Sequence, residues 1–372
     1  MIEIRELKTK SDLKKFLKFP FQLYKDNPYW TPSIIANELK NLDPKINPVF
    51  DRAEARFFIA EKNGEWLGRI AVIANWLEIE DQKKSKIRFG WFDVIDDISV
   101  TEALISKVIE IGKSHGLQYM EGPVGFSNMD KAGLLVEGFE YQNTMVTLYN
   151  HPYYKDHFEK LGFDVADEWV EYKFDFDKVD SNKLNRLSDM IQRRYNLKMR
   201  NFTHKNQVFP YVNEMFELIN ETYAALPVFV PIGKAQIEYL KHRYIAFINP
   251  RFIKCVFDEN DEMIAVAITM PSFSKALKKA NGRLFPTGFW HLMQAQKKND
   301  KAEFYLIGIK PSYQNKGVTS IVFNEMRKTF SDFGVTHVET NPELIDNQNV
   351  QLLWKKYQSV QHKRRKSFKK DL

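Results

Sequence analysis

The pattern of apolar and polar positions predicts the same succession of elements twice along the chain. In the first half, the apolar runs 56–61 and 66–73 flank a short polar segment that contains Gly64, which is typical of a β-hairpin. The second half has the corresponding hairpin at 252–257 and 263–268. Each hairpin is followed by a predicted strand, helix and strand, at 87–94, 100–114 and 116–121 in the first half and at 302–309, 317–332 and 334–339 in the second. This order indicates a diverged internal duplication.

Weaker signals set the ends of the two halves. Residues 158–163 correspond to residues 354–359 as a short closing helix. The apolar–charged alternation of residues 173–178 predicts the last strand of the first half, and Asp180 begins a typical helix start. We therefore expect two domains, residues 1–179 and residues 180–372. A long segment, residues 272–299, is inserted in the second half between hairpin and strand and contains two amphipathic pieces.

A phosphate-binding turn is predicted directly after the strand at 304–309. Residues 310–313 break the strand because proline fixes φ and donates no hydrogen bond. Apolar residues at helical spacing then follow the turn, so its amide groups lie at a helix N-terminus, where N–H donors lack intrahelical partners and the dipole favours anions. The residues expected to bind the anion are Gln314, Asn315, Lys316, Gly317, Val318 and Thr319.

This turn resembles the acyl-CoA pyrophosphate loop of the Gcn5-related N-acetyltransferase (GNAT) superfamily. The family pattern is Arg/Gln-x-x-Gly-x-Gly/Ala, which Gln314 and Gly317 match and from which Thr319 departs. The order of elements in both halves is also the GNAT order. The resemblance implies an α/β (α+β) protein with two tandem GNAT-like domains, each a mixed, mostly antiparallel sheet flanked by helices.

The resemblance also implies an acyl-CoA-dependent N-acyltransferase, with acetyl-CoA as the expected donor and a small-molecule or peptide amine as the acceptor. Ile307 and Ile309 lie on the strand with which the pantetheine arm pairs in this family, and an N–H near Ile309 would bind the oxyanion. Asn347, Val350 and Leu353 fall on the asparagine, alanine and leucine positions of the family's last-helix pattern. A GNAT-fold binding protein without catalysis is the alternative.

The general acid expected from the resemblance is missing. The family uses a tyrosine in the last helix, but Trp354 takes this position in the second half and Phe158 in the first. Neither ring can protonate a leaving thiolate. Tyr357 and Tyr313 are the alternative acids, and the missing tyrosine favours the non-catalytic alternative.

Two carboxylates on adjacent predicted strands, Glu303 and Glu339, are the candidate bases, acting through water. Carboxylates at strand ends also have structural roles. No His-Glu-x-x-His pair occurs, and Cys255 is the single cysteine, so the sequence indicates no zinc site.

The first half lacks the features of a phosphate turn. Residues 94–101 contain no glycine, and Asp96 and Asp97 would repel an anion while serving well as helix-start residues. We expect the first half to be a degenerate repeat and the second half to hold the single acyl-CoA site.

Two loops leave alternatives open. Residues 122–128 follow a strand and either line a cleft between the halves or only turn the chain, and the turn is favoured. Residues 28–32 form an aromatic, proline-bracketed loop that either covers the acceptor site, as in the GNAT family, or packs on the surface.

Charge and composition limit the partners and the cellular location that we expect for this protein. The net charge is +7, of which the last ten residues carry +5, so the basicity is a local feature of the C-terminal segment. Nucleic acid is therefore an unlikely partner, although a basic tail can bind RNA. No apolar run approaches the ~18 residues of a membrane span. The single cysteine suits a reducing cytosol, so we expect a cytoplasmic protein without a membrane partner. The oligomeric state is not readable from the sequence.

Overall fold

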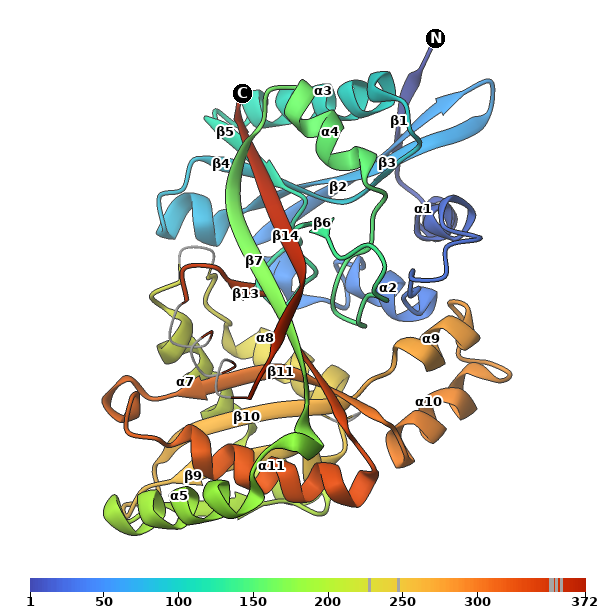
Figure 1. The fold of residues 1–372 in the computed structure, drawn as a ribbon. Helices are drawn as coiled ribbons and strands as arrows, with labels where there is room; N and C mark the ends of the chain where they lie inside the picture. The colour runs from blue at the N-terminus through green and yellow to red at the C-terminus, as the bar shows by residue number, and fades with distance from the viewer. Residues whose placement is uncertain (227–228, 246–247, 348–350, 352–353, 355–356) are drawn as a thin grey trace.

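Strands from both halves of the chain form one continuous sheet (Figure 1). The computed structural model describes residues 1–226, 229–245, 248–347, 351, 354 and 357–372. Val350 and Leu353 of the last-helix pattern lie outside the described residues.

The elements of the first half agree with the predicted succession, and hairpin, strand and helix begin and end within a few residues of the expected positions. In chain order they are β1 (Glu3–Leu7), α1 (Lys10–Leu23), α2 (Ile35–Asn41), β2 (Ala53–Lys62), β3 (Glu65–Asn75), β4 (Lys86–Val94), α3 (Ile98–Ser114), β5 (Tyr119–Gly122), β6 (Leu134–Glu137), α4 (Tyr153–Lys160) and β7 (Asp164–Asp175).

The second half repeats this order as far as β13 and adds a helical hairpin between β10 and β11. The predicted closing helix at 354–359 lies partly outside the described residues. Its elements are α5 (Ser181–Arg194), β8 (Lys198–Asn201), α6 (Lys205–Val208), α7 (Val212–Tyr223), α8 (Lys234–Leu240), β9 (Ile253–Phe257), β10 (Met263–Pro271), α9 (Ser274–Ala280), α10 (Gly288–Lys297), β11 (Lys301–Ile309), α11 (Thr319–Phe333), β12 (His337–Thr340), β13 (Glu343–Leu344) and β14 (Val360–Asp371). Single turns of 3-10 or π helix occupy Pro48–Asp51, Leu77–Asp81, Phe176–Lys178, Phe209–Tyr211, Lys241–Ile245, Pro250–Phe252 and Pro311–Tyr313.

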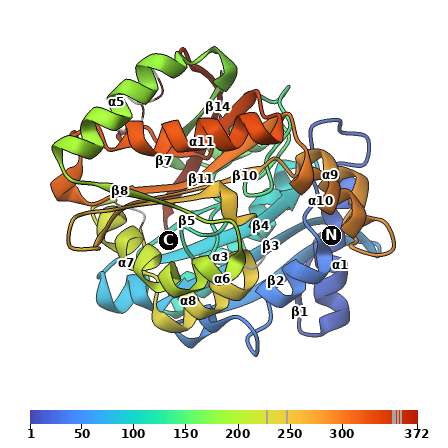
Figure 2. The ribbon, with the colours of Figure 1, turned by 90° about the horizontal axis from the view of Figure 1, so that it is seen from below.

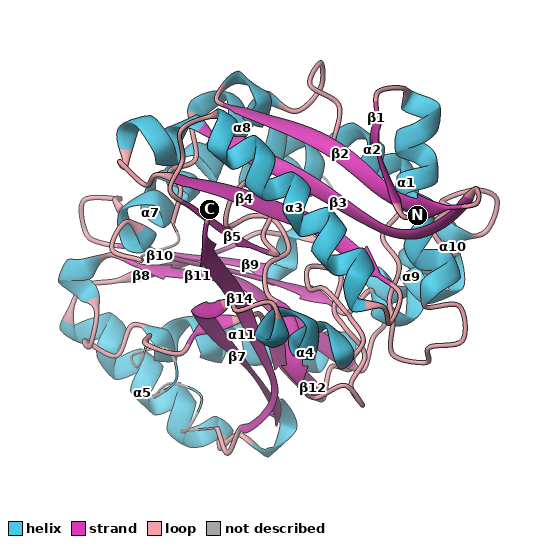
Figure 3. Cartoon of the chain, turned by 90° about the horizontal axis from the view of Figure 1, so that it is seen from above, coloured by secondary structure: helices cyan, strands magenta, loops and turns pink. Residues whose placement is uncertain are grey.

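Helices cover both faces of the sheet in each half. In the first half, Val100, Leu104 and Val108 recur at helical spacing on α3 and are fully buried against the core of β2, β3 and β4 (Figure 3). Helix α1 packs on the opposite face through Phe16 and Leu17. In the second half, α11 and α5 lie side by side over one face, and α7 and α8 cover the other (Figure 2).

The strands β7 and β14 exchange partners between the halves. The sheet order is β1-β2-β3-β4-β5-β14-β7-β12-β11-β10-β9-β8, so the last strand of the chain pairs with β5 of the first half. Strand β7 pairs with β12 of the second half, and the two exchanged strands pair with each other along most of their length. Figure 1 shows them crossing the molecule diagonally between the two groups of strands.

This exchange was not expected from the sequence, which placed residues 173–178 at the end of the first half's own sheet. In the structure, Lys173 and Phe174 pair with Glu339 and Val338 of β12. Strand pairing depends on distant partners, which local alternation does not specify. The division into domains between residues 179 and 180 stays a prediction. Strands pair across this division, since β7 pairs with β12 and β14 pairs with β5.

Deletion of residues 360–372 should destabilise both halves, because β14 closes the first-half sheet and also pairs with β7. We expect a melting temperature lower by ~10 °C or more and faster hydrogen exchange in both β5 and β12. An unchanged melting temperature, or faster exchange in β12 alone, would contradict the strand exchange.

Candidate active site

The second-half sheet opens where β11 and β12 separate. The two strands pair in parallel from Lys301 and His337 to Phe304 and Thr340. The amide of Asn341 still donates to the carbonyl of Phe304 at 3.1 Å, and beyond this point the chain turns away toward β13. The Asn341 side-chain amide also donates to the Tyr305 carbonyl at 3.0 Å. Beyond Tyr305, no strand among the described residues pairs with β11 on this side, so its edge is open there.

A β-bulge lies at this point of separation. Ile268 and Thr269 are consecutive on β10, yet they pair with Leu306 and Phe304, so Tyr305 is the extra residue. The carbonyls of Ile307 and Ile309 accept hydrogen bonds from the Tyr223 hydroxyl at 3.1 Å and the Gln314 side-chain amide at 3.0 Å rather than from a neighbouring strand.

Because the N–H and C=O of one residue point to the same side of a strand, the amides of Ile307 and Ile309 also face the opening. The structure thus places both residues, as the sequence predicted, on a strand edge available to a ligand.

A cavity of about 280 Å³ lies at the opening between β11 and β12 and extends between the two halves. The second half contributes Phe304, Tyr305 and Ile307 from β11 and the predicted Asn347 from the segment after β13. The first half contributes the loop after β5, including Val124 and residues 127–130. This loop was favoured as a simple turn, but it forms part of the cavity wall.

The sequence did not identify one carboxyl group in this cavity wall, that of Glu343. Its Oε1 accepts a hydrogen bond from the Trp354 indole at 2.6 Å, while its Oε2 is shielded from solvent and has no hydrogen-bond partner among the described residues. Burial raises the pKa of Glu343 to about 8, against the opposing hydrogen bonds from Trp354 and Thr340. A carboxyl group that titrates near neutrality can accept or release a proton during a reaction.

Trp354, at the position of the expected tyrosine, therefore holds the Glu343 carboxyl group in place through a hydrogen bond. The indole is almost completely buried, lines the same cavity, and fixes one oxygen of Glu343. No sequence signal indicated this pair, because Glu343 follows a strand end without any motif around it.

The predicted phosphate turn has the expected backbone shape. Asn315 and Gly317 adopt positive φ angles of 60° and 80°, and α11 begins at Thr319 without a side-chain cap. Among the described residues, the amides of Gly317, Val318 and Thr319 have no hydrogen-bond acceptor.

The corresponding turn of the first half is closed by a side chain. Asp97 caps α3, and its carboxylate accepts from the Ser99 amide at 2.9 Å, so a negative charge already occupies the helix N-terminus. The two halves thus differ at this position as the sequence indicated.

The two candidate bases, Glu303 and Glu339, are buried neighbours on β11 and β12 and line neither cavity. Burial raises the pKa of Glu303 to about 7, and the Ser272 hydroxyl donates to one of its oxygens at 2.6 Å. Burial alone would raise the pKa of Glu339 too. The positive charges of Lys363 and Lys301 and a hydrogen bond from His362 oppose this effect, and the pKa of Glu339 lies well below its usual value. Their catalytic roles stay predictions.

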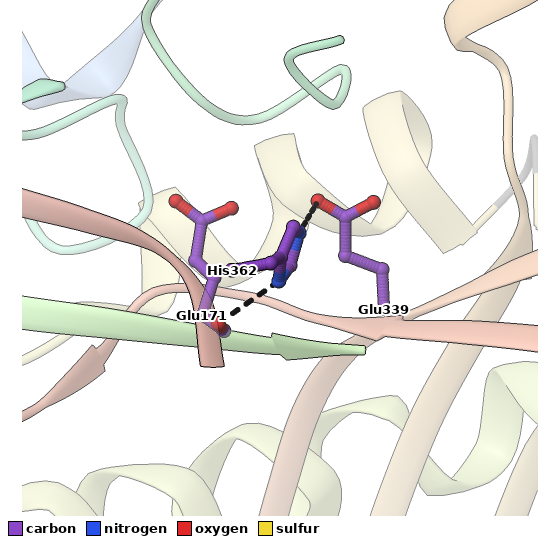
Figure 4. A group of neighbouring side chains, drawn as sticks. All are labelled: Glu171, Glu339 and His362. Carbon is purple, nitrogen blue, oxygen red and sulfur yellow. Dashed lines mark hydrogen bonds and ion pairs between the residues drawn. The ribbon is translucent and has the colours of Figure 1, made fainter. Parts of the chain in front are cut away.

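Glu339 belongs to a buried charged cluster at the crossing of the exchanged strands. Figure 4 shows its side chain beside those of Glu171 on β7 and His362 on β14, with His362 Nε2 3.0 Å from Glu339 Oε1. Arg365 donates to Glu171 at 2.5 Å, and Lys363 forms ion pairs with both carboxylates.

Three ligand atoms of this cluster, from Glu171, Glu339 and His362, lie within 4.8 Å of one another, as in a metal site. The Lys363 ammonium already lies against both carboxylates and supplies the positive charge that a metal ion would bring. We therefore assign no metal to this group.

The two alternative acids lie away from the opening. Tyr357 stacks on Phe323 with ring centres 4.9 Å apart, and burial raises the pKa of its hydroxyl. Tyr313 lies in the turn before α11, where the Lys316 ammonium is 5.0 Å from its ring. Neither tyrosine lines either of the two cavities described here.

A second cavity, of about 370 Å³, adjoins the first on the side of the first half. Its walls are largely apolar and include Trp30 of the proline-bracketed loop, Trp91 of β4, and Leu277 and Leu292 of the α9–α10 hairpin. The two cavities share four lining residues, Val124, Met129, Asp130 and Val146. Trp30 and Thr31 of loop 28–32 thus line a cavity, and whether the loop covers an acceptor site stays a prediction.

Comparison with known proteins identifies the fold. No known protein-family profile matches the chain. A tandem GNAT protein from the clavulanic acid biosynthesis pathway superimposes with a TM-score of 0.59 over 100% of this chain and 98% of its own, at 10% identity. A GCN5-related N-acetyltransferase from Sphaerobacter thermophilus gives a TM-score of 0.53 over 100% and 95% of the two chains, at 9% identity. The chain therefore has a tandem GNAT fold, and the predicted fold class is confirmed.

Two curated proteins are similar in sequence along most of the chain. Protein YghO of Escherichia coli K12 is 24% identical over 99% of this chain and 95% of its own length. The bacterial ceramide synthase of Caulobacter vibrioides is 25% identical over 84% of this chain and 82% of its own.

Proposed function

We propose that this protein is an acyl-CoA-dependent N-acyltransferase whose acceptor is an amine attached to an apolar chain. The observation that carries the proposal is the opening between β11 and β12, where free strand amides, an apolar cavity and the Glu343 carboxyl group meet. An acyl donor and an amine can be brought together there, away from bulk water.

The donor would bind along the second half only. The pyrophosphate would lie against the free amides of Gly317, Val318 and Thr319, and the pantetheine arm would run along the open edge of β11 toward Phe304. The amides of Ile307 and Ile309 face this path and would donate to it or to the oxyanion. The acetyl group stays the donor predicted from the resemblance.

Glu343 would move the proton during transfer. The amine nitrogen attacks the thioester carbon, so that a C–N bond forms and the C–S bond breaks. Glu343 Oε2 accepts the proton that the nitrogen loses and returns it to the departing sulfur, which leaves as the CoA thiol. Trp354 positions the carboxyl group for this task, and a separate tyrosine acid is not needed.

The nature of the acceptor rests on the second cavity and on one relative. A ceramide is an amide between a fatty acyl group and a long-chain amino alcohol, and a ceramide synthase is among the similar proteins. The apolar cavity beside the opening supports an acceptor of this class for the present chain. The non-catalytic alternative loses its main support, because Trp354 holds a titratable group at the opening.

Calorimetric titration should detect one acyl-CoA per chain. Gly317→Glu should abolish this binding, because a carboxylate would enter the pyrophosphate turn and repel the phosphates. The left-handed φ of Gly317, and Ile191 at 3.1 Å from an added Cβ, also predict a modest loss of stability, so circular dichroism must show that the variant is folded.

Asp96→Ala is the matched control in the first half, and it should leave acyl-CoA binding unchanged. Two acyl-CoA sites per chain, or wild-type affinity in folded Gly317→Glu, would place the donor elsewhere.

Glu343→Gln should lower kcat by roughly 10²–10⁴-fold with little change in acyl-CoA affinity. In the wild type the rate should rise with pH as Glu343 loses its proton, around its pKa of about 8, and this rise should be absent in the variant. Glu303→Gln is the control, because Glu303 is buried outside the cavities. If Glu303→Gln instead removes the pH dependence, the sequence-predicted base is correct and the assignment of Glu343 is wrong.

A further inference from the structure

The hairpin formed by α9 and α10 exposes large apolar side chains to solvent. Phe285 is 77% exposed, Trp290 59%, Phe289 51% and Met293 37%. All four lie within one short stretch that projects from the edge of the molecule (Figure 1). Exposed aromatic residues that gather in this way mark an interaction surface.

The same hairpin is strongly basic. Between residues 263 and 299 the chain has no aspartate or glutamate, and it has six cationic residues, Lys275, Lys278, Lys279, Arg283, Lys297 and Lys298. All six are exposed. Lys275 forms an ion pair with Asp300 at 3.3 Å, just beyond this stretch. An aromatic surface with a surplus of positive charge complements a partner that is apolar and anionic.

The hairpin also forms a wall of the second cavity. Leu277, Leu284 and Leu292 line that cavity, and Phe289 both lines it and is half exposed. The hairpin is tied to the first half, since the Gly282 carbonyl accepts from the Ile35 amide at 3.0 Å. The α9–α10 hairpin therefore carries both the exposed aromatic residues and a wall of the second cavity.

We propose that the α9–α10 hairpin docks this protein onto an anionic lipid bilayer. Phe285, Phe289, Trp290 and Met293 enter the interface between headgroups and acyl chains, and the lysines and Arg283 contact the anionic headgroups. An apolar substrate dissolved in the bilayer then enters the second cavity beside Phe289 without crossing water.

This docking needs no membrane-spanning segment. Among the helices that the structure describes, none is long and apolar enough to cross a bilayer. The sequence prediction of no membrane partner considered spanning runs only, and the proposed docking of the α9–α10 hairpin departs from it. Vesicle binding can be measured without donor or acceptor, so its outcome is separate from that of the proposed acyl transfer.

The test is co-sedimentation of the full-length protein with phosphatidylcholine vesicles and with vesicles that also contain phosphatidylglycerol. We expect binding to the anionic vesicles, weakened by added salt. The double variant Phe285→Ser/Trp290→Ser should lose binding by on the order of tenfold or more. Neither residue lines the cavity, so acyl-CoA binding should be retained.

The matched control is Leu187→Ser/Met190→Ser on α5, two other exposed apolar residues, which should bind vesicles like the wild type. A second measurement covers the case in which the double variant is unstable. Brominated lipids should quench the tryptophan fluorescence of the wild type, and the conservative Trp290→Phe should reduce this quenching.

Three results would overturn the proposal. One is equal, weak sedimentation with both kinds of vesicle. Another is a wild-type dimer that Phe285→Ser/Trp290→Ser dissociates, with no vesicle binding. The third is binding of RNA, but not of vesicles, that is lost in Lys279→Glu/Lys298→Glu.

Discussion

The buried charged cluster at the crossing of β7 and β14 is the constraint on which the rest of the structure depends. Glu171 and Glu339 are almost completely inaccessible, and Lys363, Arg365 and Lys301 neutralise them. Taking these charges out of water is costly, and a cluster of this kind is favourable only when every member is present. Loss of one partner would leave an uncompensated buried charge, at a cost of about 3–5 kcal/mol.

The residues of the cluster come from strands of both halves, so the cluster specifies how the halves meet. In the observed arrangement, with β14 between β5 and β7, Lys363 lies against both carboxylates. The opening between β11 and β12 then faces the loop after β5, and the first cavity acquires walls from both halves. The first half thus contributes to the cavity walls, although the N-terminus of its helix α3 is capped by Asp97. It lines part of both cavities, while the second half contributes the α9–α10 wall of the second cavity, the turn at Gly317 and Glu343.

The sequence predicted the local elements well and their long-range relations poorly. The hairpins, α3, α11 and the turn at Gly317 follow from local periodicity and turn chemistry, and their bounds agree with the structure within a few residues. The exchange of β7 and β14 could not be found in this way, because alternation along 173–178 fits either sheet equally well. Glu303 and Glu339 are predicted as bases because they lie on adjacent strands, but Glu339 belongs to the charged cluster and Glu303 accepts a hydrogen bond from the buried Ser272 hydroxyl. The hydrogen bond from Trp354 to Glu343 forms between two segments that are separate in the sequence, and no local sequence pattern predicts that they are close in the fold.

The most direct test of the proposed acyl transfer is product formation by the full-length protein. The protein would be incubated with acetyl-CoA or a long-chain acyl-CoA, together with either a long-chain amino alcohol or a short polar polyamine. Released CoA thiol and amide product would then be quantified by mass spectrometry. We predict equal amounts of CoA and amide with the long-chain amine and little of either with the polyamine. Acyl-CoA binding without release of CoA for any amine, or transfer to the polyamine alone, would contradict it.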